Sequence, residues 1–319
     1  MNTAPPLTWV IGRGGLLGKS VEAAARSRGQ VWKPAVPITW SDVGKGRSEL
    51  RFNVREFLYV AGAGRWSVAW CAGAGAINAP SELLEDELTA LRETLESLGE
   101  VTGKGEGTFF FASSAGAVYA GVDAPPYNES SPVRPLTAYG RAKLEAEALI
   151  SEWSIGSGTP ALIGRISNLY GPGQNVFKAQ GLISQICRSY LVDRPLLIYV
   201  PLDTLRDYLF APDCASLIVD GLARLRRQRD LSSSMVVTKI LASQRAITVG
   251  AVLGEVRRIF KKPPRIVIGA SSASAAQVRD LSLLSVVWPD LDRRALTPFP
   301  VGVAATTADL RRRLQRAEL

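Results

Sequence analysis

Apolar segments alternate with amphipathic ones through the first two thirds of the chain. The apolar runs are LTWVIG (7–12), RWSVAWCAGAG (65–75), GTFFFASSAG (107–116) and PALIGRISNLYG (160–171). Helical patterns lie between them, from Leu16 to about Arg28, from about Ser81 to Leu98, and after Tyr139. Such alternation is typical of a parallel sheet covered by helices. The pattern therefore predicts an α/β protein with a Rossmann-like, doubly wound parallel sheet.

The pattern changes after about residue 171. Shorter helices and strands follow, separated by proline-rich turns such as KKPP (261–264) and TPFP (297–300). This change predicts a smaller C-terminal α+β lobe. We expect a dinucleotide-binding domain over 1–170 and the lobe over most of 171–319, with part of 200–235 returning to the first domain.

Composition narrows the class of protein without changing this fold. The hydrophobic fraction of 46% and the charged fraction of 21% are ordinary for a folded, soluble chain. The longest uncharged stretches, Trp66 to Ser81 and Thr108 to Val122, are shorter than the roughly 20 apolar residues that span a bilayer. We therefore expect no membrane segment. The first residues lack a basic n-region, so we expect no signal peptide and a cytoplasmic location.

The types of side chain present limit the chemistry. The chain has no histidine, which excludes Ser-His-Asp triads, Cys-His dyads and most catalytic zinc sites, and we predict no metal. Its three cysteines are far apart and show no paired spacing, so we expect them to be reduced. The net charge of +9 comes from scattered segments such as RLRRQR (224–229), without interleaved aromatic residues. We interpret these as solvated faces and expect no nucleic-acid partner.

A glycine-rich loop follows the first apolar run. Gly12, Gly15 and Gly18 form the pattern G-x-x-G-x-x-G between a predicted strand and a predicted helix. Glycine is needed there because a cofactor pyrophosphate must approach the backbone and the helix N-terminus without an intervening Cβ. The loop predicts a dinucleotide site.

The residues after this loop leave the identity of the dinucleotide open. An acidic residue near the end of the second strand commonly binds the ribose hydroxyls, yet no carboxylate occurs between Glu22 and Asp42. Lys33 lies there instead, and Arg13 lies within the glycine loop. Positive charge suits the 2′-phosphate of NADP, while both residues are equally compatible with a plain surface role. The cofactor is therefore NAD or NADP.

The segment PLTAYGRAK (135–143) contains a tyrosine and a lysine that are four residues apart. Thr137 is suited to cap a helix that begins here, which places Tyr139 and Lys143 on one helical face. An ammonium beside a phenol stabilises the phenolate and lowers the pKa of the phenol. Such a tyrosine can exchange a proton with a substrate hydroxyl while a nicotinamide exchanges the hydride.

The ordered set of motifs resembles the extended short-chain dehydrogenase/reductases, specifically the nucleotide-sugar epimerase and dehydratase group. The resemblance covers nearly the whole chain and rests on IGRGGLLG (11–18), WCAGAG (70–75), ASSAGAVYA (112–120), YGRAK (139–143), RISNLYGPGQN (165–175) and RPLLIYVPLDTLRDYLFAPDCA (194–215). It implies a nucleotide-diphosphate sugar as substrate, bound mainly by the C-terminal lobe over 171–319, and a role in polysaccharide biosynthesis. It also implies a homodimer formed through the helices near 81–98 and 138–153.

The resemblance also assigns roles to residues. It implies that Tyr139, Lys143 and a serine form the catalytic set. The commonest spacing of the family falls on Ala115, so the serine has to be chosen from the two residues before it. We choose Ser114 and keep Ser113 as the alternative. The cofactor is expected to contact Gly12, Arg13, Gly15, Leu16, Leu17, Gly18, Lys33, Asn53, Ala72, Gly73, Tyr139 and Lys143. The substrate is expected to contact Ser114, Asn168, Arg206 and Arg279. Asp207 is expected to orient Arg206, and a surface salt bridge is the alternative for Arg279.

The reaction within this group is harder to assign. Dehydratases of the group carry an Asp-Glu pair beside the catalytic hydroxyl, where this chain has Ala115 and Gly116, so a 4,6-dehydratase is not expected. We prefer an NAD(P)-dependent epimerase that removes and returns a hydride at a sugar carbon, C4 by resemblance. The alternatives are an NADPH-dependent 4-keto nucleotide-sugar reductase and a non-catalytic dinucleotide-binding sensor or scaffold.

Overall fold

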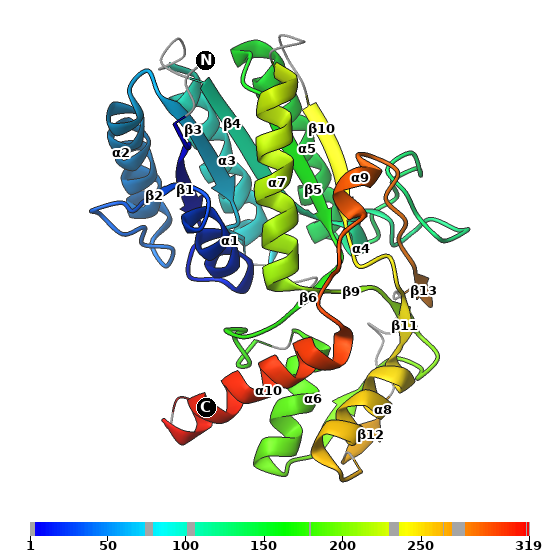
Figure 1. Ribbon diagram of the computed structural model, residues 1–319. Coiled ribbons are helices and arrows are strands. Elements are labelled where there is room, and N and C mark those ends of the chain that lie inside the picture. The colour runs from blue at the N-terminus through cyan, green and yellow to red at the C-terminus, as the bar shows by residue number, and fades with distance from the viewer. Residues whose placement is uncertain are drawn as a thin grey trace.

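A large parallel sheet forms the upper part of the molecule (Figure 1). The computed structural model describes residues 4–73, 79–100, 106–178, 180–229, 236–263, 265–269, 278–316 and 318. The sheet has six strands in the order β10-β5-β4-β3-β1-β2, and each neighbouring pair is parallel. The strands are β1 (Leu7–Ile11), β2 (Gln30–Trp32), β3 (Arg65–Trp70), β4 (Glu106–Ser114), β5 (Ala161–Ile166) and β10 (Val236–Leu241).

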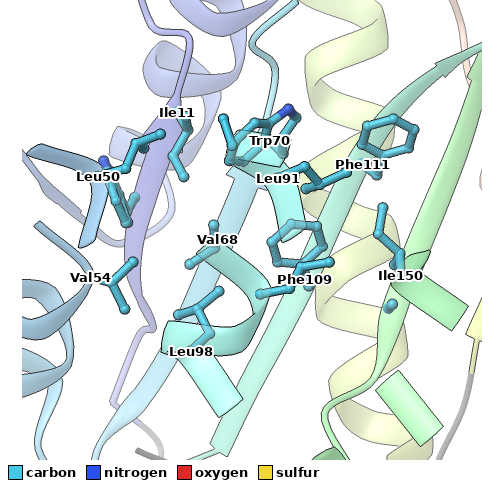
Figure 2. Close-up of a cluster of buried hydrophobic side chains, with 14 of the residues drawn as sticks. Ile11, Leu50, Val54, Val68, Trp70, Leu91, Leu98, Phe109, Phe111 and Ile150 are labelled. Atoms are coloured by element: carbon cyan, nitrogen blue, oxygen red, sulfur yellow. The ribbon is translucent and has the colours of Figure 1, made fainter. Parts of the chain in front are cut away.

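Helices cover both faces of this sheet. One face packs against α2 (Val43–Ala61), α3 (Ser81–Glu100) and α5 (Ala138–Ser157), and the other against α1 (Leu16–Arg26) and α7 (Ala211–Arg229). Successive residues of β4 divide between the faces: Phe109 and Phe111 point to the first, and Phe110 points to the second. Figure 2 shows the first of these cores. Strands that are apolar on both sides require two helical layers, which explains the continuous apolar runs in the sequence.

A smaller lobe lies below the sheet in Figure 1. It is built on α6 (Leu182–Val192), α8 (Val249–Phe260) and α10 (Phe299–Gln315), whose apolar faces share a core with Tyr170 and Tyr208. Short strands connect the lobe to the sheet: β6 (Asn168–Tyr170) pairs with β9 (Tyr208–Phe210), and β8 (Leu205–Arg206) lies between β11 (Ile247–Thr248) and β13 (Asp280–Leu281). A third pair of short strands joins β7 (Leu196–Ile198) and β12 (Ile266–Ile268). Two short helices complete the described elements: α4 (Ala115–Val118) and α9 (Pro289–Asp292).

The expected fold class is confirmed. The segment that returns to the large sheet comprises α7 and β10, so it continues past residue 235 to Leu241. The sequence pattern did not indicate α2. Within the described residues, β2 is the last strand on its edge of the sheet, whereas doubly wound dinucleotide-binding sheets commonly have a further strand there.

Candidate active site

Close packing makes glycine necessary at two positions of the loop between β1 and α1. Gly12 has a φ of +85°, and a Cβ on it would lie 2.4 Å from the backbone nitrogen of Ala72 at the end of β3. A Cβ on Gly18 would lie 2.2 Å from the carbonyl oxygen of Gly12. The Gly15 amide donates to the same carbonyl at 3.0 Å, which closes the turn. These contacts hold the loop, β3 and the start of α1 together.

The space beside the N-terminus of α1 suits an anion. A methyl group on Gly14 would meet no atom within 4 Å, and no side chain caps the helix at Gly15. The first-turn amides of a helix lack intrahelical partners, and with the helix dipole they favour a bound phosphate. Leu16 and Leu17 belong to this turn, and because the Leu17 side chain is buried in the core, it offers a ligand only its backbone. These residues fit the pyrophosphate of a dinucleotide.

A cluster of basic side chains surrounds Glu22 on α1. Its carboxylate accepts hydrogen bonds from Arg13 at 2.8 Å and from Arg26 at 2.5 Å, and the Lys33 ammonium lies 3.9 Å away. Arg13, Glu22 and Arg26 also line an open pocket together with Lys19. Three cations around one carboxylate leave excess positive charge beside the glycine loop. The structure thus brings together Arg13 and Lys33, which are 20 residues apart in the sequence.

Tyr139 and Lys143 lie one turn apart on α5. Thr137 caps this helix by accepting a hydrogen bond from the Gly140 amide at 3.2 Å, as expected. The Lys143 Nζ atom lies 5.5 Å from the centre of the Tyr139 ring and 4.9 Å from that of Phe111, and it donates to the Ala112 carbonyl at 3.3 Å. Both side chains are nearly buried, at 9% and 8% exposure. The pair therefore lies at the carboxyl end of β4.

The two candidate serines differ in their surroundings. Ser113 is buried, and its hydroxyl donates to the Glu147 carboxylate at 2.5 Å. Ser114 is partly exposed where β4 ends, and it makes no side-chain cap hydrogen bond to α4. Ala115, the position favoured by the commonest spacing, is fully buried among apolar side chains. This arrangement favours Ser114 as the hydroxyl that faces a substrate.

A buried polar network behind the two serines was not predicted from the sequence. Arg165 on β5 donates to Glu147 at 2.7 Å and to the Tyr119 hydroxyl at 2.8 Å, and the Ser113 hydroxyl also donates to Glu147. Burial raises the pKa of Tyr119, although Arg165 opposes that shift. The network ties β4, β5 and α5 together, which fixes α5 relative to the strand that carries Ser114.

The predicted substrate residues meet on the short strands below the sheet. The Asn168 side-chain amide donates to the Asp207 carbonyl at 3.0 Å, which brings Asn168 beside Arg206. Arg206 is partly buried; burial lowers the pKa of its guanidinium, and its Nη1 atom donates to the Leu205 carbonyl at 2.8 Å. The expectation that Asp207 orients Arg206 is wrong, because the Asp207 carboxylate accepts hydrogen bonds from Ser243 and from the Arg245 amide.

Arg279 also comes to this group of strands, since its carbonyl accepts a hydrogen bond from the Leu205 amide at 2.8 Å. Its guanidinium forms an ion pair with Asp203, and 75% of its side chain is exposed. The neighbouring Leu281 packs over α4, close to Gly116. The strands that carry Arg206 therefore adjoin the helix that follows Ser114.

Asn53 is placed differently from the other expected cofactor residues. It lies within α2, is fully buried, and donates to the Val36 carbonyl at 2.9 Å. The resemblance implies that Asn53 stands near the adenine, but its side chain is buried and bonded within the protein, so we do not include it in the candidate site. Ala72 and Gly73 follow β3 and lie beside Gly12 and Lys143, respectively. Residues 74 and 75 of the WCAGAG segment lie outside the described residues.

Comparison with known proteins agrees with this arrangement. The model of the NAD dependent epimerase/dehydratase family matches residues 67–232. The chain belongs to this family, and the resemblance to nucleotide-sugar epimerases and dehydratases is confirmed.

Among curated relatives, the dTDP-L-rhamnose 4-epimerase of Burkholderia thailandensis is 34% identical over 92 residues, which are 28% of this chain and 25% of that protein. The UDP-glucose 4-epimerase of Azospirillum brasilense is 27% identical over 229 residues, 67% of this chain and 63% of that protein. The matched segments span less than two thirds of either relative. A solved structure, MoeE5 in complex with UDP-glucose and NAD, superposes with a TM-score of 0.78 at 21% identity and covers 97% of this chain and 99% of its own. It shows the same fold.

Proposed function

We propose that this protein is an NAD(P)-dependent epimerase of a nucleotide-diphosphate sugar, acting at C4. The observation that carries the proposal is the buried Tyr139 and Lys143 pair at the carboxyl end of β4, next to a glycine loop that fits a pyrophosphate. Membership of the family and the 4-epimerases among the relatives support it.

Each residue has a distinct role in this proposal. The Tyr139 phenolate accepts the proton of the sugar hydroxyl and later returns it, and the Lys143 ammonium stabilises the phenolate. Ser114 donates a hydrogen bond to the same sugar oxygen and fixes its position. A bound nicotinamide dinucleotide supplies the acceptor and donor of the hydride. Asn168 and Arg206 bind the diphosphate, since a guanidinium suits bidentate contact with phosphate oxygens.

A second candidate, a 4-keto nucleotide-sugar reductase that uses NADPH, is favoured by the basic cluster around Glu22. Arg13, Arg26 and Lys33 surround Glu22 beside the glycine loop, and β2 ends without an acidic residue. Positive charge there would suit the 2′-phosphate of NADP. The cluster supports NADP over NAD as the cofactor. The two candidate reactions then differ in the fate of that cofactor: it stays bound in the epimerase and leaves after each turnover in the reductase.

We also propose the division of labour between the two parts of the chain. Residues 1–170, with the returning segment, hold the dinucleotide, and the remainder of 171–319 holds the nucleotide sugar.

The three free cysteines, two of them buried, suit a reducing compartment, so we propose a cytoplasmic protein of polysaccharide biosynthesis. Through α3 and α5 we propose a homodimer. No described helix is long and apolar enough to cross a bilayer.

The test begins with the cofactor that copurifies with the protein, identified by mass spectrometry after denaturation. The protein is then incubated with UDP- and dTDP-hexoses, and products are separated by chromatography. Retained dinucleotide with formation of the C4 epimer and no net change in nicotinamide absorbance supports the epimerase. Stoichiometric consumption of NADPH with a 4-keto sugar would replace it by the reductase, and no turnover with any of these sugars would overturn both.

A further inference from the structure

Glu22 on α1 occupies an edge of Arg13 that is well suited to bind a phosphate. The Arg13 Nε and Nη2 atoms donate to its carboxylate at 2.8 and 3.3 Å, and the Arg26 Nη2 atom donates to it at 2.5 Å. The Lys33 ammonium lies 3.9 Å from the same carboxylate. One carboxylate therefore binds two guanidinium groups and faces a third cation.

These four side chains differ in their exposure to solvent. The Glu22 side chain is 10% exposed, whereas those of Arg13, Arg26 and Lys33 are 44%, 59% and 52% exposed. The cations thus form the outer layer of the cluster, and the carboxylate lies beneath them. Arg13, Glu22 and Arg26 also line an open pocket with Gly14 of the glycine loop. This pocket gives a ligand on the loop access to the cations.

The cluster lies at the edge of the sheet where a dinucleotide-binding fold holds the adenosine ribose. Arg13 lies just after β1 and Lys33 directly follows β2, so both are at the carboxyl ends of neighbouring parallel strands. A carboxylate at the end of the second strand favours NAD, and a cation nearby favours NADP. Here the two kinds of charge occur together, and the carboxylate comes from α1 instead of the strand end.

A 2′-phosphate and the Glu22 carboxylate require the same donors. A guanidinium binds two oxygens at once through one of its edges, and Glu22 already occupies the Nε and Nη2 edge of Arg13. The three cations and this carboxylate together carry a charge of +2, in place of +3 for the cations alone. Both effects oppose the binding of a phosphate dianion more than that of an uncharged ribose hydroxyl.

We propose that Glu22 competes with the 2′-phosphate of NADP for Arg13 and Arg26, and so limits the preference of the site for NADP over NAD. The three cations attract the 2′-phosphate, and Glu22 offsets part of that attraction. The result is a site that accepts both dinucleotides. This inference rests on the dinucleotide site of the proposed function and does not depend on which reaction follows.

The experiment measures the dissociation constants of NADPH and NADH by fluorescence titration of the full-length protein. Glu22→Gln keeps the size of the side chain and removes its charge. It is expected to tighten NADPH binding about tenfold and to change NADH binding less than about threefold, because only NADPH carries the 2′-phosphate. Glu22→Met, a second uncharged variant of similar size, is expected to do the same if Glu22→Gln does not fold.

Two matched variants separate charge from structure. Glu22→Asp keeps the charge and is expected to leave the ratio of the two dissociation constants within about threefold of the parent protein. Asp220→Asn removes a carboxylate on α7 that pairs with Arg28, beyond the other end of α1, and with Arg294. It is expected to leave the ratio unchanged.

Four outcomes decide the inference. An unchanged ratio, or weaker NADPH binding, in the uncharged Glu22 variants overturns it, since a carboxylate that only holds the cations in place gives that result. A shift of equal size in Glu22→Asp also overturns it. A ratio shifted toward NADPH in a protein that turns over no nucleotide sugar retains the inference and rejects the proposed reaction. A parent protein that binds neither dinucleotide overturns both.

Discussion

Ser113 donates a 2.5 Å hydrogen bond to Glu147, whereas the next residue, Ser114, reaches the partly exposed end of β4. Adjacent strand residues point to opposite sides, so one serine supports the structure and the other is placed to face a ligand. This difference separates two hydroxyls that the sequence left as alternatives.

Ser114→Ala is expected to lower kcat about 100-fold, because a hydrogen-bond donor to the reacting oxygen is lost. The fold should be unaffected. Ser113→Ala is expected to lower the free energy of unfolding by about 1–3 kcal/mol instead, because a buried carboxylate loses a donor. Steady-state kinetics and urea denaturation of both variants measure these effects. The reverse assignment of effects would make Ser113 the catalytic serine.

Tyr139→Phe is expected to reduce kcat by about 10³-fold or more, since the phenol is the group that exchanges the proton. Binding of the dinucleotide should change little, because the glycine loop and the Glu22 cluster remain intact. Isothermal titration calorimetry with NAD and NADP measures binding, and product analysis measures turnover. Turnover at the parent rate would remove Tyr139 from the mechanism.

Arg206→Ala is expected to raise KM for the nucleotide sugar about tenfold or more and to lower kcat less, because the contact it removes is made equally in the ground and transition states. Arg279→Ala is the matched comparison. Its guanidinium is exposed and paired with Asp203, so it should change KM by less than about threefold. A larger change in KM for Arg279→Ala than for Arg206→Ala would contradict this assignment.

Arg13→Ala and Lys33→Ala are each expected to weaken NADP(H) binding about tenfold and to leave NAD(H) binding within about twofold, because only NADP carries the 2′-phosphate. Arg28→Ala is the control, since Arg28 also lies at the surface but pairs with Asp220 on α7. Fluorescence titrations with both reduced cofactors give the ratio of the two dissociation constants. Equal weakening of both cofactors would place these residues at the pyrophosphate or outside the site.

The proposed homodimer is expected to tighten severalfold as the salt concentration rises from about 50 to about 500 mM. The outward side chains of α3 and α5 are rich in carboxylates: Glu82, Glu85, Glu96, Glu145 and Glu152 are all exposed. In a two-fold dimer through these helices the same acidic surface of both subunits meets, and salt screens the resulting repulsion. Analytical ultracentrifugation measures the dimerisation constant, and a monomer at micromolar concentration in both salts would contradict the dimer.

Features that depend on neighbouring residues were predictable from the sequence. The glycine loop, the cap at Thr137 and the Tyr139 and Lys143 spacing each involve a few consecutive residues, whose geometry follows from local rules. The alternation of apolar and amphipathic segments also gave the parallel sheet, because its strands are buried on both faces.

Features that depend on distant partners were not predictable. Arg165 meets Glu147 across 18 residues and Ser113 meets Glu147 across 34, so no local pattern reveals that Ser113 is already bonded. Glu87 lies on a helix with several other acidic residues, and only the packing of α3 against α5 shows which of them lines a cavity beside the proposed catalytic pair. The sequence pattern did not indicate α2, so nothing in the sequence showed that Asn53 is buried in the middle of a helix.

The large sheet ends at β2, which is only three residues long. An edge strand leaves backbone amides and carbonyls unpaired, and these can recruit a strand from another chain. Here Lys33 and Pro34 follow the strand directly, and proline has no amide to offer. This edge of the sheet therefore offers few free backbone groups to a strand from another chain.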